Sequence, residues 1–172
     1  MKRVHHLLAI LTVICLGGTS ACTQTSVRFA AVGDFNVSDN ARSVASLIAS
    51  WKPDFVITVG DNNYMNVGTT AAWDDAVGQF YHPYIKYPAG STSRYAPAQG
   101  HPARPGNNFY PALGNHDWDA GGFTAYFDLP GNERYFDYVR GPVHLLVVDS
   151  DPREADGISS GSAQGVWLQN AL

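Results

Sequence analysis

Three apolar runs in this chain each end at a glycine that is followed by side chains able to bind a metal ion or to transfer a proton. In chain order, those side chains are Asp34, Asp61, Asn115, His116 and Asp117. Carboxylate and amide oxygens with one imidazole are the ligand types that Zn, Mn, Mg or Fe prefer over soft thiolate sites. Two cations roughly 3.5–4 Å apart activate water as hydroxide and stabilise an in-line displacement at phosphorus. The residue types therefore favour hydrolysis of a phosphate ester.

This interpretation rests on the repetition of one pattern, a polar side chain just after a glycine at the end of an apolar run. A single Gly-Asp pair after a strand is more often a turn or a helix cap than a metal ligand. Asp34 and Asp61 both follow a strand exit, and Asn115 with His116 follows a third, which argues against coincidence. Asn115 alone could equally be a turn residue that tolerates a positive φ angle, and this alternative stays open.

A β-α-β unit is predicted to position the two aspartates. Val27–Val32 is rich in β-branched and aromatic residues and is typical of a buried strand. Apolar residues then recur at helical spacing from Ser38, and Pro53 ends that pattern. Asp54–Val59 is a nearly continuous apolar run, as found in a parallel strand covered on both faces.

The remaining chain is predicted to alternate regular elements with one long irregular segment. Residues 81–107 are rich in Pro, Gly, Ser and Tyr without a sustained period, which indicates a surface excursion forming an ordered wall beside the site. The other predicted elements are helices at 71–80, 123–127 and 162–172, a strand at 110–113, and a hairpin of 134–139 with 143–148.

Composition and charge limit the classes of function that the chain can have. With 172 residues, 45% of them apolar and 15% charged, the chain has room for one domain with a core. The formal net charge of −4 leaves no basic surface for nucleic acid, so we expect no nucleic-acid partner.

The first residues are typical of a targeting segment. Lys2 and Arg3 precede an apolar run that leads to small residues and Cys22, so residues 1–21 are predicted to be a signal peptide and 22–26 a tether. Residues 19–22 resemble a lipoprotein processing site with Cys22 lipidated, and an ordinary secretory signal is the alternative. Either interpretation predicts export to the periplasm or the outer face of the cell envelope, with membrane attachment only in the first.

In order and spacing, three motifs resemble the first three motifs of the calcineurin-like metallophosphoesterases. They are Gly33-Asp34, Gly60-Asp61-Asn62-Asn63-Tyr64 and Gly114-Asn115-His116-Asp117. The tyrosine three places after the second aspartate is similar to the purple acid phosphatase branch. The resemblance implies an α/β fold, a calcineurin-like α/β/β/α sandwich of which residues 27–172 hold the N-terminal part, with a dinuclear metal site at the carboxyl ends of the strands.

The resemblance also implies roles for single residues. Asp34 would bind the first metal, Asp61 would bridge both, and Asn115 would bind the second. Tyr64 would give a phenolate to the first metal, a pairing that goes with ferric iron beside Zn, Mn or Fe. His116 would act on the substrate phosphate as general acid or charge stabiliser, and Asp117 would orient its ring. The resemblance further implies that Asp149 is a structural residue at the end of a strand, and it implies no protein partner.

The last two motifs of the family, which supply three imidazole ligands, have no counterpart before residue 172, so we expect a C-terminally truncated domain with weak or absent activity. His82, His101 and His144 are not expected to replace them. One alternative is a non-catalytic envelope lipoprotein that binds a ligand or partner through Tyr81, Tyr84, Tyr87 and Tyr95. Another is a gene fragment with Trp167 and Leu168 left uncovered.

Overall fold

The computed structural model describes residues 26–98 and 106–172. The predicted signal peptide, the tether before Ser26, Cys22 and His101 lie outside the described residues. Its strands are β1 (Phe29–Val32), β2 (Phe55–Thr58), β3 (Phe109–Tyr110), β4 (Phe136–Arg140) and β5 (Val143–Val147). Its helices are α1 (Asp39–Trp51), α2 (Thr70–Trp73), the π-helical η1 (Asp74–Gly78), α3 (Gln79–Tyr81), the 3₁₀-helical η2 (Ala96–Ala98), α4 (Asn115–Ala120), α5 (Phe123–Tyr126) and α6 (Ala163–Ala171).

The first three strands form one parallel sheet in the order β1-β2-β3. Helix α1 connects β1 to β2, which confirms the predicted β-α-β unit. The side chain of Ser38 caps α1 by accepting a hydrogen bond from the Ala41 backbone at 3.1 Å, and Lys52 ends it in the left-handed conformation just before Pro53. Because the strands are parallel, their carboxyl ends lie at one edge of the sheet.

The predicted helix at 71–80 is present, but its middle is a π-helical turn rather than α-helix. Asp74 opens that turn and is buried, with 3% of its surface exposed. Its carboxylate accepts hydrogen bonds from the hydroxyl of Tyr126 at 2.8 Å and the backbone N–H of Arg94 at 2.9 Å. The buried carboxylate of Asp74 thus connects this helix to two later segments of the chain, one at Arg94 and one at Tyr126.

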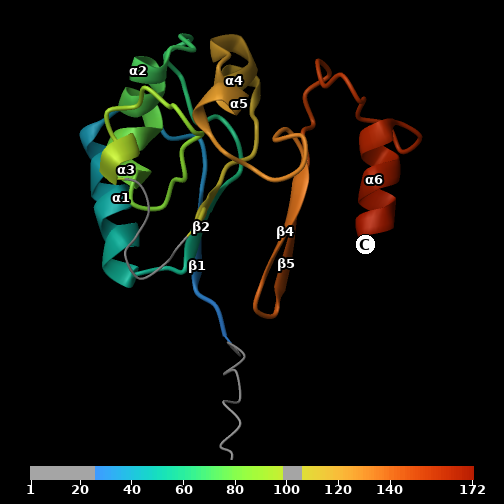
Figure 1. Cartoon of the computed structure of the whole chain (residues 1–172), viewed down its shortest axis with the longest axis horizontal. Helices are drawn as coiled ribbons and strands as arrows, with labels where there is room; N and C mark the ends of the chain where they lie inside the picture. Colours follow the sequence, from blue (N-terminus) through green and yellow to red (C-terminus); the bar gives the residue numbers. More distant parts are fainter. Residues whose placement is uncertain (1–25, 99–105) are drawn as a thin grey trace, which may run out of the picture.

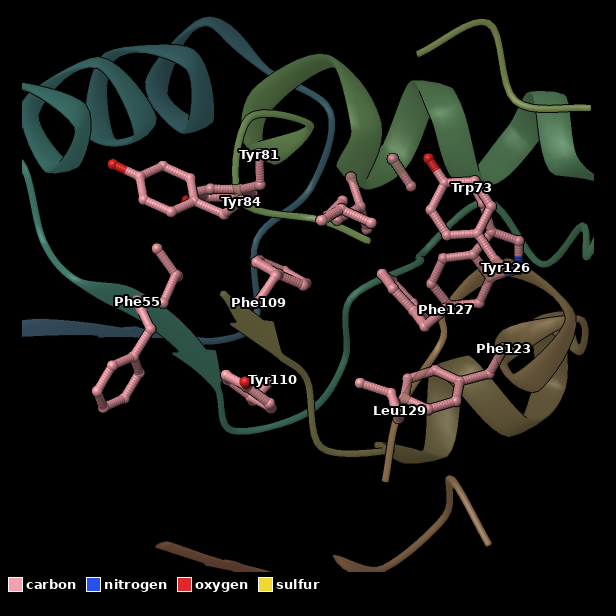
Figure 2. Close-up of a cluster of buried hydrophobic side chains, with 14 of the residues drawn as sticks. Phe55, Trp73, Tyr81, Tyr84, Phe109, Tyr110, Phe123, Tyr126, Phe127 and Leu129 are labelled. Carbon is pink, nitrogen blue, oxygen red and sulfur yellow. The ribbon is translucent and has the colours of Figure 1, made fainter. Parts of the chain in front are cut away.

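An aromatic core packs on both faces of the sheet (Figure 2). Tyr81 and Tyr84 lie on the side of the helices α1 to α3, whereas Phe55 and Tyr110 point to the opposite side. Tyr81 stacks on Phe109 with ring centroids 5.4 Å apart, so α3 packs directly on β3. Trp73 is fully buried and packs against Tyr126 and Phe127 from the segment around α5. The core therefore joins the start of the 81–107 segment, at Tyr81, to the sheet.

The prediction that 81–107 is a surface excursion is wrong for its first part. Tyr81, Tyr84, Ile85 and Tyr87 are each at most 6% exposed. Asn108 of the following segment donates its backbone N–H to the Tyr84 carbonyl at 2.9 Å. The segment lacks periodicity because its tyrosines are buried one at a time by separate contacts, and not along one face of a regular helix or strand.

The hairpin of β4 with β5 is antiparallel, as predicted, and packs on the face of the sheet opposite α1 to α3 (Figure 1). The ring of Tyr138 in β4 lies 3.8 Å from that of Tyr110 and 5.7 Å from that of Phe55. Helix α6 lies beyond the hairpin in Figure 1, and Trp167 from α6 packs on Tyr135 at 4.9 Å. The predicted β3 at 110–113 is shorter in the structure, since only Phe109 and Tyr110 pair with β2.

Several apolar side chains remain at the surface of the described residues. Phe29 is 42% exposed and only Ala30 of β1 is buried, so β1 is not the buried strand that the sequence predicts. Val59, which follows β2, is 68% exposed. Trp167 is only half-buried, whereas β2 is buried at three of its four positions, as predicted. Within residues 26–98 and 106–172, no helix is both long and apolar enough to cross a membrane.

Candidate metal and phosphoester site

The carboxyl ends of the three parallel strands surround an open cleft of about 340 Å³. Asp34 after β1, Asp61 after β2 and Asn115 after β3 all line it. The opposite wall is the loop after β5, through Ser150, Asp151 and Pro152. The structure therefore brings together the three strand-end residues that the sequence singled out.

Close backbone packing explains the glycines before these residues. A Cβ on Gly114 would lie 2.1 Å from Oδ1 of Asp61, and Gly60 has a φ of +103°. Asp34 and Asp61 themselves have φ angles of 52°, in the left-handed region that aspartate tolerates better than most residues. The chain turns sharply at each strand end, and the turn directs the carboxylates into the cleft.

Tyr64 lies between the two aspartates. Its hydroxyl donates to Oδ1 of Asp34 at 3.0 Å and lies 3.3 Å from Oδ2 of Asp61. Burial, together with the hydrogen bond to Asp34 and the charge of Asp61, raises the pKa of Tyr64 to about 12. Without a cation the tyrosine is thus a neutral phenol whose proton is shared by two carboxylates.

His116 is held beside this group by its backbone and its ring. Its N–H donates to Oδ1 of Asp61 at 3.1 Å, and its ring lies 4.2 Å from that of Tyr64. Its Nδ1 atom is buried and has no hydrogen-bond partner among the described residues. An unpaired buried polar atom is costly and calls for an explanation, such as a ligand.

Asp117 does not orient the ring of His116, contrary to the prediction. It is 1% exposed, and its carboxylate accepts four N–H groups at 2.8–2.9 Å. The donors are the backbone N–H groups of Asn62, Asn63 and Gly114 and the side-chain amide of Asn62. Burial raises the pKa of Asp117 to about 6, and these donors oppose a larger rise. Asp117 therefore ties the second strand-end loop to the third.

Two residues that the sequence did not single out support the site. Asn62 is fully buried, and its amide donates to Asp117 and to the Ala112 carbonyl at 2.8 Å. Trp118 of α4 donates its indole N–H to Asp149 at 2.9 Å, so Asp149 has the structural role expected of it. Position beside a motif was the available signal for both, but neither has a residue type that indicates its partner.

The donors fit one cation better than two. Asp34, Asp61 and Tyr64 already converge through hydrogen bonds, and a cation could take the place of the shared phenolic proton. Asn115 lines the same cleft but is exposed. In the part of the chain that the structure describes, no three His, Cys, Asp or Glu side chains group closely enough to hold a metal ion. The group at Tyr64 comprises only two carboxylates and a phenol.

The fold and the cleft define an α/β protein that places oxygen donors at the carboxyl edge of a parallel sheet. The sequence matches the family model of the calcineurin-like phosphoesterases over residues 27–161, which is well over half of the chain. The chain belongs to this family, and the predicted family is confirmed. No curated protein matches the chain.

Proposed function

We propose that the protein is a metal-dependent phosphoesterase of the purple acid phosphatase type, acting on a small phosphate ester. One observation supports this above all. Asp34, Asp61 and Tyr64 converge within hydrogen-bond distance at one cleft, and Asn115 lines that cleft from the third strand end. Family membership supports the reaction class.

Asp34, Asp61 and Tyr64 would hold one cation, and Asp61 with Asn115 would hold the second. Bound cations of this kind supply a Lewis acid and lower the pKa of bound water. The raised pKa of Tyr64 keeps its phenol protonated at neutral pH, and the phenolate oxygen would be available to a cation held there. His116, held beside Tyr64 through Asp61, would hold the proton destined for the leaving oxygen.

We expect the 172-residue polypeptide by itself to be a slow enzyme, because its described residues offer the second cation only Asp61 and Asn115. Purified protein is assayed on an aryl phosphate with Mn, Zn or Fe, and Mn²⁺ binding is measured in parallel. Asp61→Ala should abolish both the slow turnover and the binding, whereas Asp137→Ala on the hairpin should leave both unchanged. A wild-type protein that binds no cation would refute the proposed function. Turnover like that of complete relatives would refute only the slow rate.

The ferric assignment predicts a colour. Iron-loaded protein should show a visible charge-transfer band from the Tyr64 phenolate, and Tyr64→Phe should remove it while the protein stays folded. A colourless iron-loaded wild type would exclude a ferric phenolate and leave the divalent metals as candidates.

We also propose that the protein is exported, from the residue pattern that precedes Cys22. Mass spectrometry of the mature N-terminus distinguishes a lipidated Cys22 from an unmodified start.

The alternative function, a lipoprotein that binds a ligand or partner through exposed tyrosines, loses its expected binding surface, since Tyr81, Tyr84 and Tyr87 are buried.

A further inference from the structure

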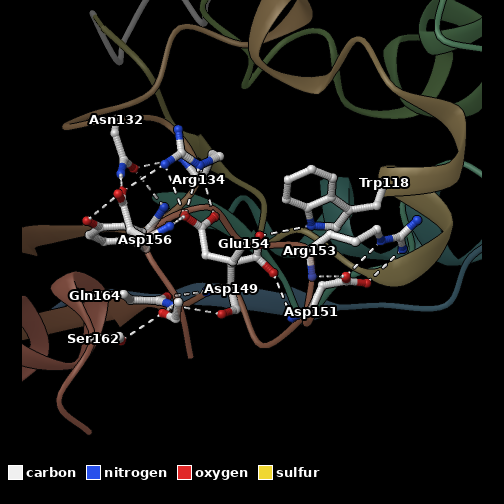
Figure 3. A network of polar contacts seen from close by, with 12 residues as sticks. Trp118, Asn132, Arg134, Asp149, Asp151, Arg153, Glu154, Asp156, Ser162 and Gln164 are labelled. Carbon is white, nitrogen blue, oxygen red and sulfur yellow. Dashed lines mark hydrogen bonds and ion pairs between the residues drawn. The ribbon is translucent and has the colours of Figure 1, made fainter. Parts of the chain in front are cut away.

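Arg153, in the loop after β5, connects that loop to the helix that carries Asn115 and His116 (Figure 3). Its Nη2 atom donates to the backbone carbonyl of Asn115 at 3.1 Å, and its Nη1 atom donates to Asp119 at 2.7 Å. The same guanidinium binds Asp151 through Nε and Nη2 at 2.8 and 2.7 Å. One side chain therefore joins the start and the fifth residue of α4 to the opposite wall of the cleft.

Helix α4 needs such external support. It has six residues, and helices this short are not stable by themselves in water because nucleation costs more than one turn returns. Its first residue follows a glycine, and the N–H groups at its start donate to the carboxylates of Asp117 and Asp61, which leaves its carbonyls and its outer side to Arg153. The guanidinium of Arg153 also lies 5.6 Å from the ring centroid of Trp118, which adds a cation–π contact on the same helix.

The surroundings of Arg153 argue against a direct role in binding phosphate. Two carboxylates, Asp119 and Asp151, surround one guanidinium, so the group is net negative. The hydrogen bonds that Arg153 donates to Asp151 raise the pKa of Arg153 and lower the pKa of Asp151, so both stay charged. Most of the N–H donors of Arg153 are already used within the protein.

We propose that Arg153 is a positioning residue, which holds α4 so that Asn115 lines the cleft and His116 stays beside Asp61 and Tyr64. This inference rests on the proposed function, because its consequence is cation binding at Asp61 and Asn115. Arg153 acts through the backbone of Asn115 and touches neither cation nor substrate.

The test compares two arginines in similar surroundings. Arg94 is 52% exposed at its side chain, pairs with Asp75 and Asp74, and lies 5.2 Å from the ring of Tyr95, whereas Arg153 is 42% exposed. Arg94 belongs to the segment beside the aromatic core and not to the cleft. Arg153→Met and Arg94→Met thus remove the same kind of contacts at two places.

Three measurements are made on each full-length variant: Mn²⁺ affinity by calorimetry, the free energy of unfolding in urea, and hydrogen exchange of the α4 amides in metal-free protein. Arg153→Met should weaken Mn²⁺ affinity about tenfold and speed exchange in α4, while Arg94→Met leaves both unchanged. Arg153→Lys should restore stability but only part of the affinity, because an ammonium cannot reproduce the forked contacts with Asp151, Asp119 and Asn115.

The outcomes separate the two proposals. If the wild type binds Mn²⁺ and Arg153→Met binds it equally well, Arg153 has no positioning role and the proposed function stands. If both arginine variants lose affinity in proportion to their loss of stability, Arg153 is merely structural and the inference is overturned. If the wild type binds no Mn²⁺, the proposed function fails and the inference fails with it.

Discussion

The two sides of the cleft are held by different physical means. The aromatic core supports the strands that end in Asp34 and Asp61, and it consists of apolar side chains such as Phe55, Trp73 and Phe109, each fully buried. A polar network supports the other side. Its members are Trp118, Asn132, Arg134, Asp149, Asp151, Arg153, Glu154, Asp156, Ser162 and Gln164 (Figure 3).

The carboxylates at the centre of the polar network, Glu154 and Asp149, are buried, whereas its arginines are partly exposed. The Glu154 side chain has no exposed surface and pairs with Arg134 at 2.9 Å. Gln164 of α6 exchanges two hydrogen bonds with the backbone of Asp149, at 2.7 and 2.9 Å. The free energy gained by burying apolar surface does not depend on protonation, whereas the free energy gained from a buried ion pair does. We therefore expect acid to loosen the Asn115 side of the cleft before it loosens the Asp34 side.

The largest expected effect lies in the aromatic core. Phe55→Ala should lower the free energy of unfolding by about 3–5 kcal/mol, because it removes a fully buried ring and leaves a cavity. Urea unfolding at neutral pH measures this loss. Phe29→Ala is the matched control, since Phe29 stacks on Phe55 at 5.2 Å but is 42% exposed, and it should cost about 1 kcal/mol. Equal losses would show that the packing of β2 does not support this side of the cleft.

Glu154→Gln should lower the free energy of unfolding by about 2 kcal/mol at neutral pH, because the hydrogen bond donated by Arg134 then has a neutral acceptor in place of a carboxylate. Burial opposes ionisation, but hydrogen bonds from Arg134 outweigh it, so the pKa of Glu154 is lowered. A carboxyl with a lowered folded-state pKa contributes stability above its unfolded pKa and loses it as pH falls through the folded value.

The difference between wild type and Glu154→Gln should therefore shrink below about pH 4, near the ordinary glutamate pKa. Urea unfolding between neutral and acid pH measures this. Asp149 acts in the opposite sense, because burial raises its pKa and its contribution falls as pH rises through the raised value. A difference that stays constant with pH would show that Glu154 contributes by packing and not by charge.

Local patterns predicted much of the fold because each element carries its own signal. Ser38 and Pro53 bracket α1, Ser162 caps α6, and a turn between two apolar runs gave the hairpin. The buried tyrosines of the 81–107 segment could not be recognised in this way. Tyr84 and Tyr87 are fixed by contacts with distant parts of the chain, and no local period reports such contacts.

The candidate site likewise contains residues that the sequence predicts and contacts that it does not. Asp34, Asp61, Tyr64 and Asn115 could be named from the sequence, since repeated strand exits and a family motif mark their positions. The partners of Asp117 could not, because three of its four N–H donors belong to Asn62 and Asn63, which reach it only after folding. Arg153 lies 38 residues from Asn115 in sequence, and nothing local to it indicates that contact.

The smallest expected effect concerns a charge at the surface of the aromatic-core region. Lys86 and Asp128 form an ion pair there, with side chains 53% and 36% exposed. Asp128→Asn should cost less than about 1 kcal/mol, because exposed pairs are solvated and pay entropy to form. At about 1 M NaCl the Debye length is about 3 Å, so urea unfolding should show no cost at all. The cost of Glu154→Gln should persist in the same salt, since its pair with Arg134 is shielded from ions. If salt erased both costs alike, the polar network would be no more protected than an ordinary surface, and the two sides of the cleft would not differ in the way proposed.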